Sequence, residues 1–116
     1  MLSFTGSLKI FLAIDPCDMR KSFNGLQGIV SEHLKADPLN GALYVFTNKR
    51  RNRLKILYYD STGLWVLAKR LEAGKFSWPK PIGGTTSLKL APEALAMLTD
   101  GIDLRDGIRR PWYQRS

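Results

Sequence analysis

Three short strand-like segments, joined by links of only a few residues, limit this chain to a small set of folds. The segments cover residues 42–47, 53–60 and 64–70, and each contains β-branched or aromatic side chains. The links are a loop at 48–52 and a tight turn at 61–63. Strands connected so closely pair antiparallel, because a parallel crossover needs about a dozen residues or more. We therefore predict an antiparallel β-meander at the centre of the fold.

The segments on either side supply further strands and a main helix. Residues 8–14 form a short apolar run between a glycine and an Asp-Pro turn, which is typical of a buried strand. Residues 19–35 repeat apolar side chains at helical spacing, which indicates an amphipathic helix with Asp18 placed to cap its N-terminus. Residues 85–90 are expected to continue the meander as its fourth strand.

The expected fold class is α+β. A length of 116 residues corresponds to one domain, so residues 1–116 are predicted to form a single small domain, with 107–116 as a flexible basic tail. In it, an antiparallel β-meander of about four to five strands carries one main amphipathic helix. Pro92 opens a short C-terminal helix over 94–98. The aromatic side chains expected in the core are Phe23, Tyr44, Phe46 and Trp65.

The residue inventory excludes several classes of protein. The chain has one cysteine, Cys17, and one histidine, His33, so no intramolecular disulfide can form. A zinc site takes about four Cys or His ligands, or three and a water, and is excluded as well. The longest apolar runs, 10–14 and 64–68, have five residues each, whereas a membrane span needs about 20. We expect a soluble, cytoplasmic protein with no membrane partner.

A cluster of cations around the loop at 48–52 is the strongest functional signal. The chain carries 18 Lys and Arg against 10 Asp and Glu, a net charge of +8, which favours a polyanionic partner. No acid occurs from residue 38 to residue 59, so nothing local neutralises this cluster. We predict nucleic-acid contacts from Lys49, Arg50, Arg51, Arg53, Lys55 and Tyr59.

The geometry of a hairpin suits such contacts. Alternation places Arg53, Lys55 and Tyr59 on one face of their strand. A two-stranded β-ribbon fits the DNA major groove, and arginine forks match phosphate oxygens and guanine edges. The alternative is a solvated hairpin tip whose charge serves solubility and protects the edge of the sheet.

Two further groups of cations extend the predicted surface. Arg20 and Lys21 fall in the first turn of the predicted helix, where cations oppose the helix dipole, so an anion or an acidic partner is expected nearby. In the tail, Arg109 and Arg110 stand close to Trp112, a mixture suited to phosphate contact and base stacking. A disordered basic end is the alternative for the tail.

The carboxylates raise the question of catalysis. Three of them converging on two divalent metals would form a nuclease or transposase site. Each has a simpler structural role, however: Asp18 caps a helix, Asp60 ends a strand and Asp100 belongs to a turn. We therefore predict no catalytic residue, no bound metal and no cofactor. His33 is expected to be structural, and Cys17 inert, since the chain has no second cysteine.

Several motifs, taken as a set, resemble one known family. In chain order they are Pro16-Cys17-Asp18-Met19-Arg20-Lys21, Phe23, Gly25-Leu26, the run from Arg50 to Tyr58, Asp60, Gly63-Leu64, Lys69-Arg70-Leu71-Glu72, Phe76, Trp78-Pro79 and Gly101-Ile102-Asp103. Between residues 8 and 106 the chain is similar to the TnpB-type accessory proteins, the second reading frame of insertion-sequence-66-type elements. It departs from the family pattern at Asp15, where glycine is expected, and at Cys17, where threonine is common.

The resemblance implies a helper protein, because such elements encode a separate, larger transposase that carries the catalytic acids. Our first hypothesis is a non-catalytic DNA-binding accessory factor for transposition, with DNA of the insertion-sequence ends and the transposase as partners. The alternative is a protein-interaction module that docks on the transposase without binding DNA. A third hypothesis, an independent metal-dependent nuclease, is disfavoured by the simpler roles of the acids. The sequence also allows a homo-oligomer.

Overall fold

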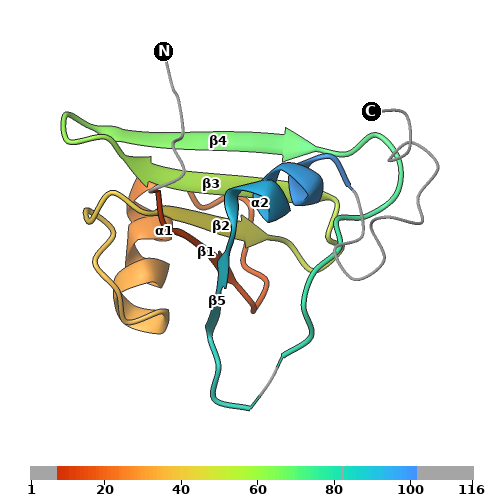
Figure 1. The fold of residues 1–116 in the computed structure, drawn as a ribbon, viewed down its shortest axis with the longest axis horizontal. Coiled ribbons are helices and arrows are strands. Elements are labelled where there is room, and N and C mark those ends of the chain that lie inside the picture. Colours follow the sequence, from red (N-terminus) through yellow and green to blue (C-terminus); the bar gives the residue numbers. More distant parts are fainter. Residues whose placement is uncertain (1–7, 82, 102–116) are drawn as a thin grey trace.

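A five-stranded mixed sheet with a helix on each face forms the fold (Figure 1). The computed structural model describes residues 8–81 and 83–101. Across the sheet the order is β4-β3-β2-β1-β5, and the strands are β1 (Ile10–Ala13), β2 (Leu43–Thr47), β3 (Arg53–Tyr59), β4 (Leu64–Arg70) and β5 (Ser87–Leu90). The helices are α1 (Phe23–Gly28), which continues as the π-helical turn η1 (Ile29–His33), and α2 (Pro92–Thr99). The predicted α+β class is confirmed.

The antiparallel meander is confirmed for three consecutive strands. β2 pairs with β3 and β3 with β4, both antiparallel, so that Lys55 lies opposite Phe46 on one side and Ala68 on the other. The links at 48–52 and 61–63 are too short for any other pairing of these neighbours.

The two remaining strands depart from the predicted meander. β1 pairs with β2 in parallel, with Ile10 opposite Leu43, because the helical segment between them is long enough for a crossover. β5 does not follow β4 as a fourth meander strand; it pairs antiparallel with β1, with Ile10 opposite Leu90. The predicted antiparallel meander is therefore wrong in the direction of the β1–β2 pairing and in the position of β5. Side-chain alternation cannot distinguish these arrangements, since its period is the same at either edge of a sheet.

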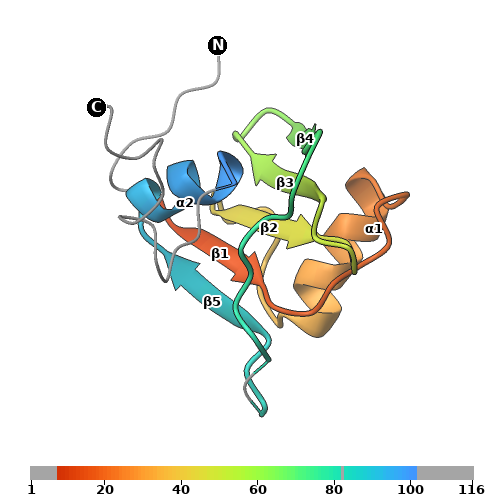
Figure 2. The same cartoon turned by 90° about the vertical axis from the view of Figure 1, so that its right-hand side faces the viewer.

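The two faces of the sheet bury separate apolar clusters, and Figure 2 shows the two helices on opposite sides. On one face, Leu26 of α1 packs in a cluster with Tyr44 of β2. On the other, Leu98 of α2 and Trp78 join Ile56 of β3. Full burial of one such apolar side chain contributes about 1.5–3 kcal/mol. Among the helices of the described residues, none has the length and apolar character of a membrane span.

Two of the four aromatic side chains expected in the core are largely outside it. Tyr44 and Phe46 are buried, but Phe23 and Trp65 are 46% and 44% exposed. Phe23 is the first residue of α1, and Trp65 lies on the edge strand β4. Both positions are at the margin of the fold, where apolar periodicity alone does not guarantee burial.

The main helix begins later than predicted. α1 starts at Phe23 rather than at residue 19, and Ser22 at its N-cap makes no side-chain capping hydrogen bond. Asp18 is therefore not a helix cap; its carboxylate accepts the backbone N–H of Arg20 at 2.8 Å in a turn ahead of the helix. Arg20 and Lys21 also precede α1, so the predicted conflict with the helix dipole does not arise.

Candidate nucleic-acid interface

Three segments that are distant in the chain meet at one end of the sheet. β1, β2 and β4 run toward this end and β3 starts from it (right-hand end of β2–β4 in Figure 1). The N–H of Cys17 donates to the Thr47 carbonyl at 2.9 Å, and the N–H of Phe76 to the Arg51 carbonyl at 2.6 Å. These bonds join residues 15–22, 48–53 and 70–76 into one surface, which we call the end face.

The β2–β3 turn within the end face is held by its own amide side chains. Asn48 Oδ1 accepts the N–H groups of Asn52 at 3.1 Å and Arg53 at 3.2 Å, while Asn48 Nδ2 donates to Asn52 Oδ1 at 2.8 Å. Arg51 takes a left-handed φ of 59°, which residues other than glycine rarely adopt. Because these bonds fix the backbone, the turn presents its cations from a rigid frame.

The turn does not project as a free two-stranded ribbon. β3 has β2 on one side and β4 on the other. The N–H of Leu71 also donates to the Asn52 carbonyl at 2.9 Å, which joins the turn to the segment after β4. A ribbon that enters a major groove needs two free flanks. The cations of the turn thus belong to the broad end face instead of a protruding hairpin.

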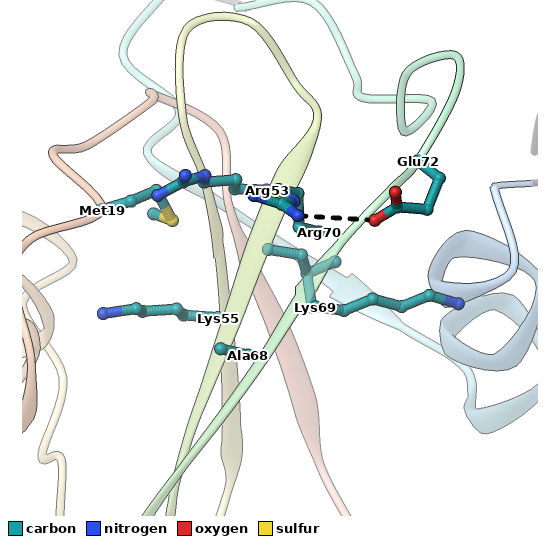
Figure 3. Close-up of a pocket in the computed structure, with 8 residues that line it drawn as sticks. Met19, Arg53, Lys55, Ala68, Lys69, Arg70 and Glu72 are labelled. Atoms are coloured by element: carbon teal, nitrogen blue, oxygen red, sulfur yellow. Dashed lines mark ion pairs between the residues drawn. The ribbon is translucent and has the colours of Figure 1, made fainter.

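Two arginines stand opposite each other on neighbouring strands of the end face. Arg53 opens β3, Arg70 closes β4, and the register pairs them directly. Side chains so paired lie on one face of the sheet, with Cβ atoms about 4.5–5.5 Å apart, where like charges destabilise the sheet. Arg70 Nη2 lies 3.6 Å from Glu72 Oε2, an exposed and loose ion pair (Figure 3). No hydrogen bond or ion pair joins the Arg53 guanidinium to any residue within 8–81 or 83–101.

Arg53 and Arg70 line two open pockets on the end face. The first, of about 390 Å³, also contacts Met19 and Lys55 (Figure 3). The second, of about 520 Å³, is lined by further charged or amide side chains: Asp18, Arg20, Asn48, Arg50 and Asn52. Met19 lines both pockets and packs partly against the apolar cluster beneath α1. Arginines from three segments therefore line one open pocket.

Polar contacts hold residues 15–22 in place beside β3. Lys55 Nζ donates to the Lys21 carbonyl at 2.7 Å, so its ammonium links β3 to this loop. Arg20 Nη2 lies 2.6 Å from Asp18 Oδ2, and the hydrogen bonds from Arg20 hold the pKa of Asp18 at about 2, below its ordinary value. Asp18 therefore stays ionised at neutral pH and matches the charge of Arg20.

The structure brings together most of the side chains predicted to contact nucleic acid. Those that line the two pockets are Arg20, Arg50, Arg53 and Lys55. Those that share the end face without lining them are Lys21, Lys49 and Arg51. Tyr59 lies at the far end of β3, about 20 Å along the strand, and its hydroxyl donates to the Ser61 carbonyl at 3.1 Å. Arg109 and Arg110 lie outside the described residues.

The surface predicted from the sequence did not include Arg70, Asn48 or Asn52, which the structure places on the end face. The signal for Arg70 was available, because a three-residue turn at 61–63 places it opposite Arg53 once the two strands are paired. The roles of Asn48 and Asn52 had a weaker signal, since asparagine in a loop most often serves the loop backbone itself.

A third pocket, of about 340 Å³, lies between residues 15–18 and η1. In it, His33 Nε2 lies 2.8 Å from Asp15 Oδ2, which joins the loop after β1 to the end of the main helix. Cys17 lines the same pocket and is half-buried. Burial raises the pKa of the Cys17 thiol, against the opposing effect of the nearby Lys21 ammonium.

Cys17 is expected to be a slow nucleophile in the folded protein. The thiolate is the reactive form, and a raised pKa leaves less thiolate at any given pH. At pH 8, we expect iodoacetamide to modify Cys17 more slowly in the native protein than in urea. The rates are followed by mass spectrometry. Equal rates in the native and unfolded protein would contradict this expectation.

Two of the acids that prompted the nuclease hypothesis, Asp18 and Asp60, lie at opposite ends of the sheet. Asp18 belongs to the end face, whereas Asp60 follows β3 at the other end. The Asp60 carboxylate accepts the Trp65 indole N–H at 2.8 Å and the Thr62 N–H at 2.9 Å, and these bonds hold its pKa well below the usual range. In the part of the chain that the structure describes, no three His, Cys, Asp or Glu side chains are grouped to hold a metal. Asp60 thus closes the β3–β4 turn.

Comparison with known proteins supports the resemblance seen in the sequence. The model of a family described as IS66 Orf2 like protein matches residues 8–108. An uncharacterized protein of Sinorhizobium fredii, y4jC, is 37% identical over 96% of this chain and 93% of its own length. A second from that organism, y4hO, is 36% identical over 90% of each chain, and no solved structure matches significantly. The chain therefore belongs to the IS66 Orf2-like family of transposition-associated accessory proteins.

Proposed function

We propose that this protein is a non-catalytic, DNA-binding accessory factor in transposition that holds the phosphate backbone on its end face. The observation that carries the proposal is the unneutralised charge there. The guanidinium groups of Arg50 and Arg53 have no hydrogen-bond or ionic partner among the described residues. Arg70 is held loosely by Glu72. Because mutually repelling cations destabilise a sheet, their presence is best explained by an anion that binds between them.

The proposed contacts give the protein affinity for DNA in general and little preference for one base sequence over another. Arginine contacts to phosphate release counterions and fix the position of a protein on DNA, but they carry little sequence information. The resemblance to insertion-sequence-66-type accessory proteins implies a separate transposase for strand cleavage, so in this proposal the chain delivers or holds the DNA. On sequence grounds alone, Arg109 and Arg110 extend the same basic track.

A salt titration tests this proposal. With about four phosphate contacts from the end-face arginines, the logarithm of the DNA association constant should fall with the logarithm of salt concentration at a slope of about −4. Fluorescence anisotropy with a labelled duplex of the element end and a scrambled duplex measures it. The control is Lys89→Ala, on the edge strand β5 away from the end face, which should keep the slope. A slope near zero for the wild-type protein would overturn the proposal.

The second candidate function is docking on the transposase, and the edge strand β4 favours it. β4 has seven residues, and its outer edge pairs with no other strand of the described chain. Trp65 on this strand is 44% exposed. A long edge strand with an exposed aromatic side chain is suited to the addition of a partner strand.

Co-purification separates this candidate from DNA binding. A tagged transposase of the same element should retain the protein after nuclease treatment, and a proline at Val66 should abolish retention if β4 is the docking edge. Lys89→Pro, at an outward-facing N–H of the edge strand β5, controls for general damage to the sheet. Release of the wild-type protein by nuclease would show that DNA bridges the two chains.

A further inference from the structure

We propose that the 520 Å³ pocket of the end face holds the terminal phosphomonoester of a DNA strand. This inference rests on the proposed DNA binding and deepens it, because it names the part of the DNA that the pocket holds. An internal phosphate of the backbone carries a single negative charge. A terminal phosphomonoester carries about −1.5 to −2 at pH 7 and offers three strong acceptor oxygens.

The charge of the pocket matches the terminal group better than the internal one. Of its four arginines, Arg20 is matched by Asp18 at 2.6 Å, and Arg70 is partly matched by Glu72 at 3.6 Å. Arg50 and Arg53 remain unmatched within the described ranges. Two unmatched positive charges on the wall of one pocket balance a dianion, whereas a monoanion would leave one of them without a partner.

The arrangement of the pocket also suits the end of a DNA strand. Its cations come from the turn at 48–53, the end of β4 and the loop after β1, and they line one open pocket. At a strand end, a terminal phosphate and the backbone phosphates beside it lie close together. Several arginines that line one pocket can donate to this group of phosphates through their planar guanidinium forks.

The frame behind these arginines is fixed before any ligand binds. The Asn48 side chain accepts the N–H of Arg53 at 3.2 Å, and the Arg51 carbonyl accepts the N–H of Phe76 at 2.6 Å. Met19 and Cys17 add apolar side chains to the lining of the pocket, whose volume lies within the range of about 300–1,000 Å³ of small-ligand sites. In our proposal, the sugar of a terminal nucleotide contacts these apolar side chains and its phosphate binds the arginines.

The test compares DNA duplexes that differ in one phosphate. Fluorescently labelled duplexes of identical sequence carry a 5′-phosphate at one strand end, a 3′-phosphate at one strand end, or hydroxyl groups at all strand ends. We expect a terminal phosphate at one end to tighten binding by about tenfold, since charge-assisted hydrogen bonds are among the strongest in proteins. Equal affinity of all three duplexes would overturn this inference while leaving the DNA-binding function intact. Binding of none of them would overturn the DNA-binding function itself.

Two variants test whether Arg53 is responsible for the preference for a phosphorylated end. Arg53→Lys keeps the positive charge but loses the planar fork, so it should keep the salt dependence of DNA binding and lose most of the preference for a phosphorylated end. Lys89→Gln, on β5, should keep both. An unchanged preference in Arg53→Lys would place the site elsewhere. Circular dichroism of each variant confirms that it is folded, which is expected because Arg53 is exposed.

Competition identifies the source of the phosphomonoester. Inorganic phosphate and a free 5′-mononucleotide carry the same charged group without a strand attached. Both should displace the phosphorylated oligonucleotide only weakly, because they lack the neighbouring backbone phosphates. A mononucleotide that binds as tightly as the phosphorylated strand would make the pocket a nucleotide site and contradict its assignment to DNA ends.

Discussion

Replacing Arg50, Arg53 and Arg70 together by alanine is expected to weaken DNA binding by two to three orders of magnitude, that is by about 10²–10³-fold near 0.1 M salt. Each lost phosphate contact removes about 0.9 from the salt slope, so three lost contacts flatten it by about 2.7. The three side chains come from the β2–β3 turn and the end of β4, and all line the 520 Å³ pocket. The same anisotropy titration measures both quantities.

Stability measurements separate this loss of binding from a loss of folding. Arg53 and Arg70 are cross-strand partners of like charge, and relief of that repulsion contributes about 0.2–1 kcal/mol to the free energy of unfolding. The triple variant should therefore melt at or above the temperature of the wild-type protein. A matched variant, Lys9→Ala, Lys80→Ala and Lys89→Ala combined, removes three exposed cations outside the end face and so loses the same charge. If it weakens binding as much as the pocket variant, net charge and not the pocket governs affinity.

The sequence predicted the local elements of this fold better than their arrangement. β4 has the predicted bounds, and β2, β3 and α2 agree within one or two residues. Each of these elements has a strong local signal, either alternation between two turns or a proline at a helix start. The parallel pairing of β1 with β2 and the placement of β5 beside β1 depend on long-range packing. The continuous apolar runs of β1 and β2 indicate strands that are buried on both faces, but they do not identify the neighbouring strands.

In the candidate site, too, local features could be predicted from the sequence, whereas contacts between distant segments could not. Arg50 and Arg53 were found because their cluster contains no acid, a property visible in the sequence. The neutralisation of Arg20 by Asp18 and the bond from Lys55 to the Lys21 carbonyl required the folded chain. Asp18 was expected to cap a helix, but the helix starts at Phe23, too late for that role. A short polar side chain before a helix satisfies a turn as readily as a cap, so the sequence alone could not decide.

Trp78→Ala is expected to destabilise the protein by about 3–5 kcal/mol, a large part of the about 5–15 kcal/mol that stabilises an ordinary domain. Trp78 is 5% exposed and packs in the cluster with Ile56 and Leu98. Its indole N–H donates to the Ala13 carbonyl at 2.9 Å, so the side chain anchors the irregular segment after β4 to the end of β1. Urea unfolding measures the loss, and an unchanged midpoint would contradict it.

Trp78→Phe separates the hydrogen bond from the packing and connects this anchor to the end face. It keeps an aromatic ring but leaves the Ala13 carbonyl without its donor, which should cost about 1–3 kcal/mol. Because Phe76 in the same segment donates to the Arg51 carbonyl, a loosened segment releases one constraint on the β2–β3 turn. We expect Trp78→Phe, measured where it is folded, to keep the salt slope of DNA binding, since no cation is lost, and to weaken the preference for a phosphorylated end. If Trp78→Phe keeps the whole preference for a phosphorylated end, the side chains of Asn48 and Asn52 hold the turn without help from the segment around Phe76.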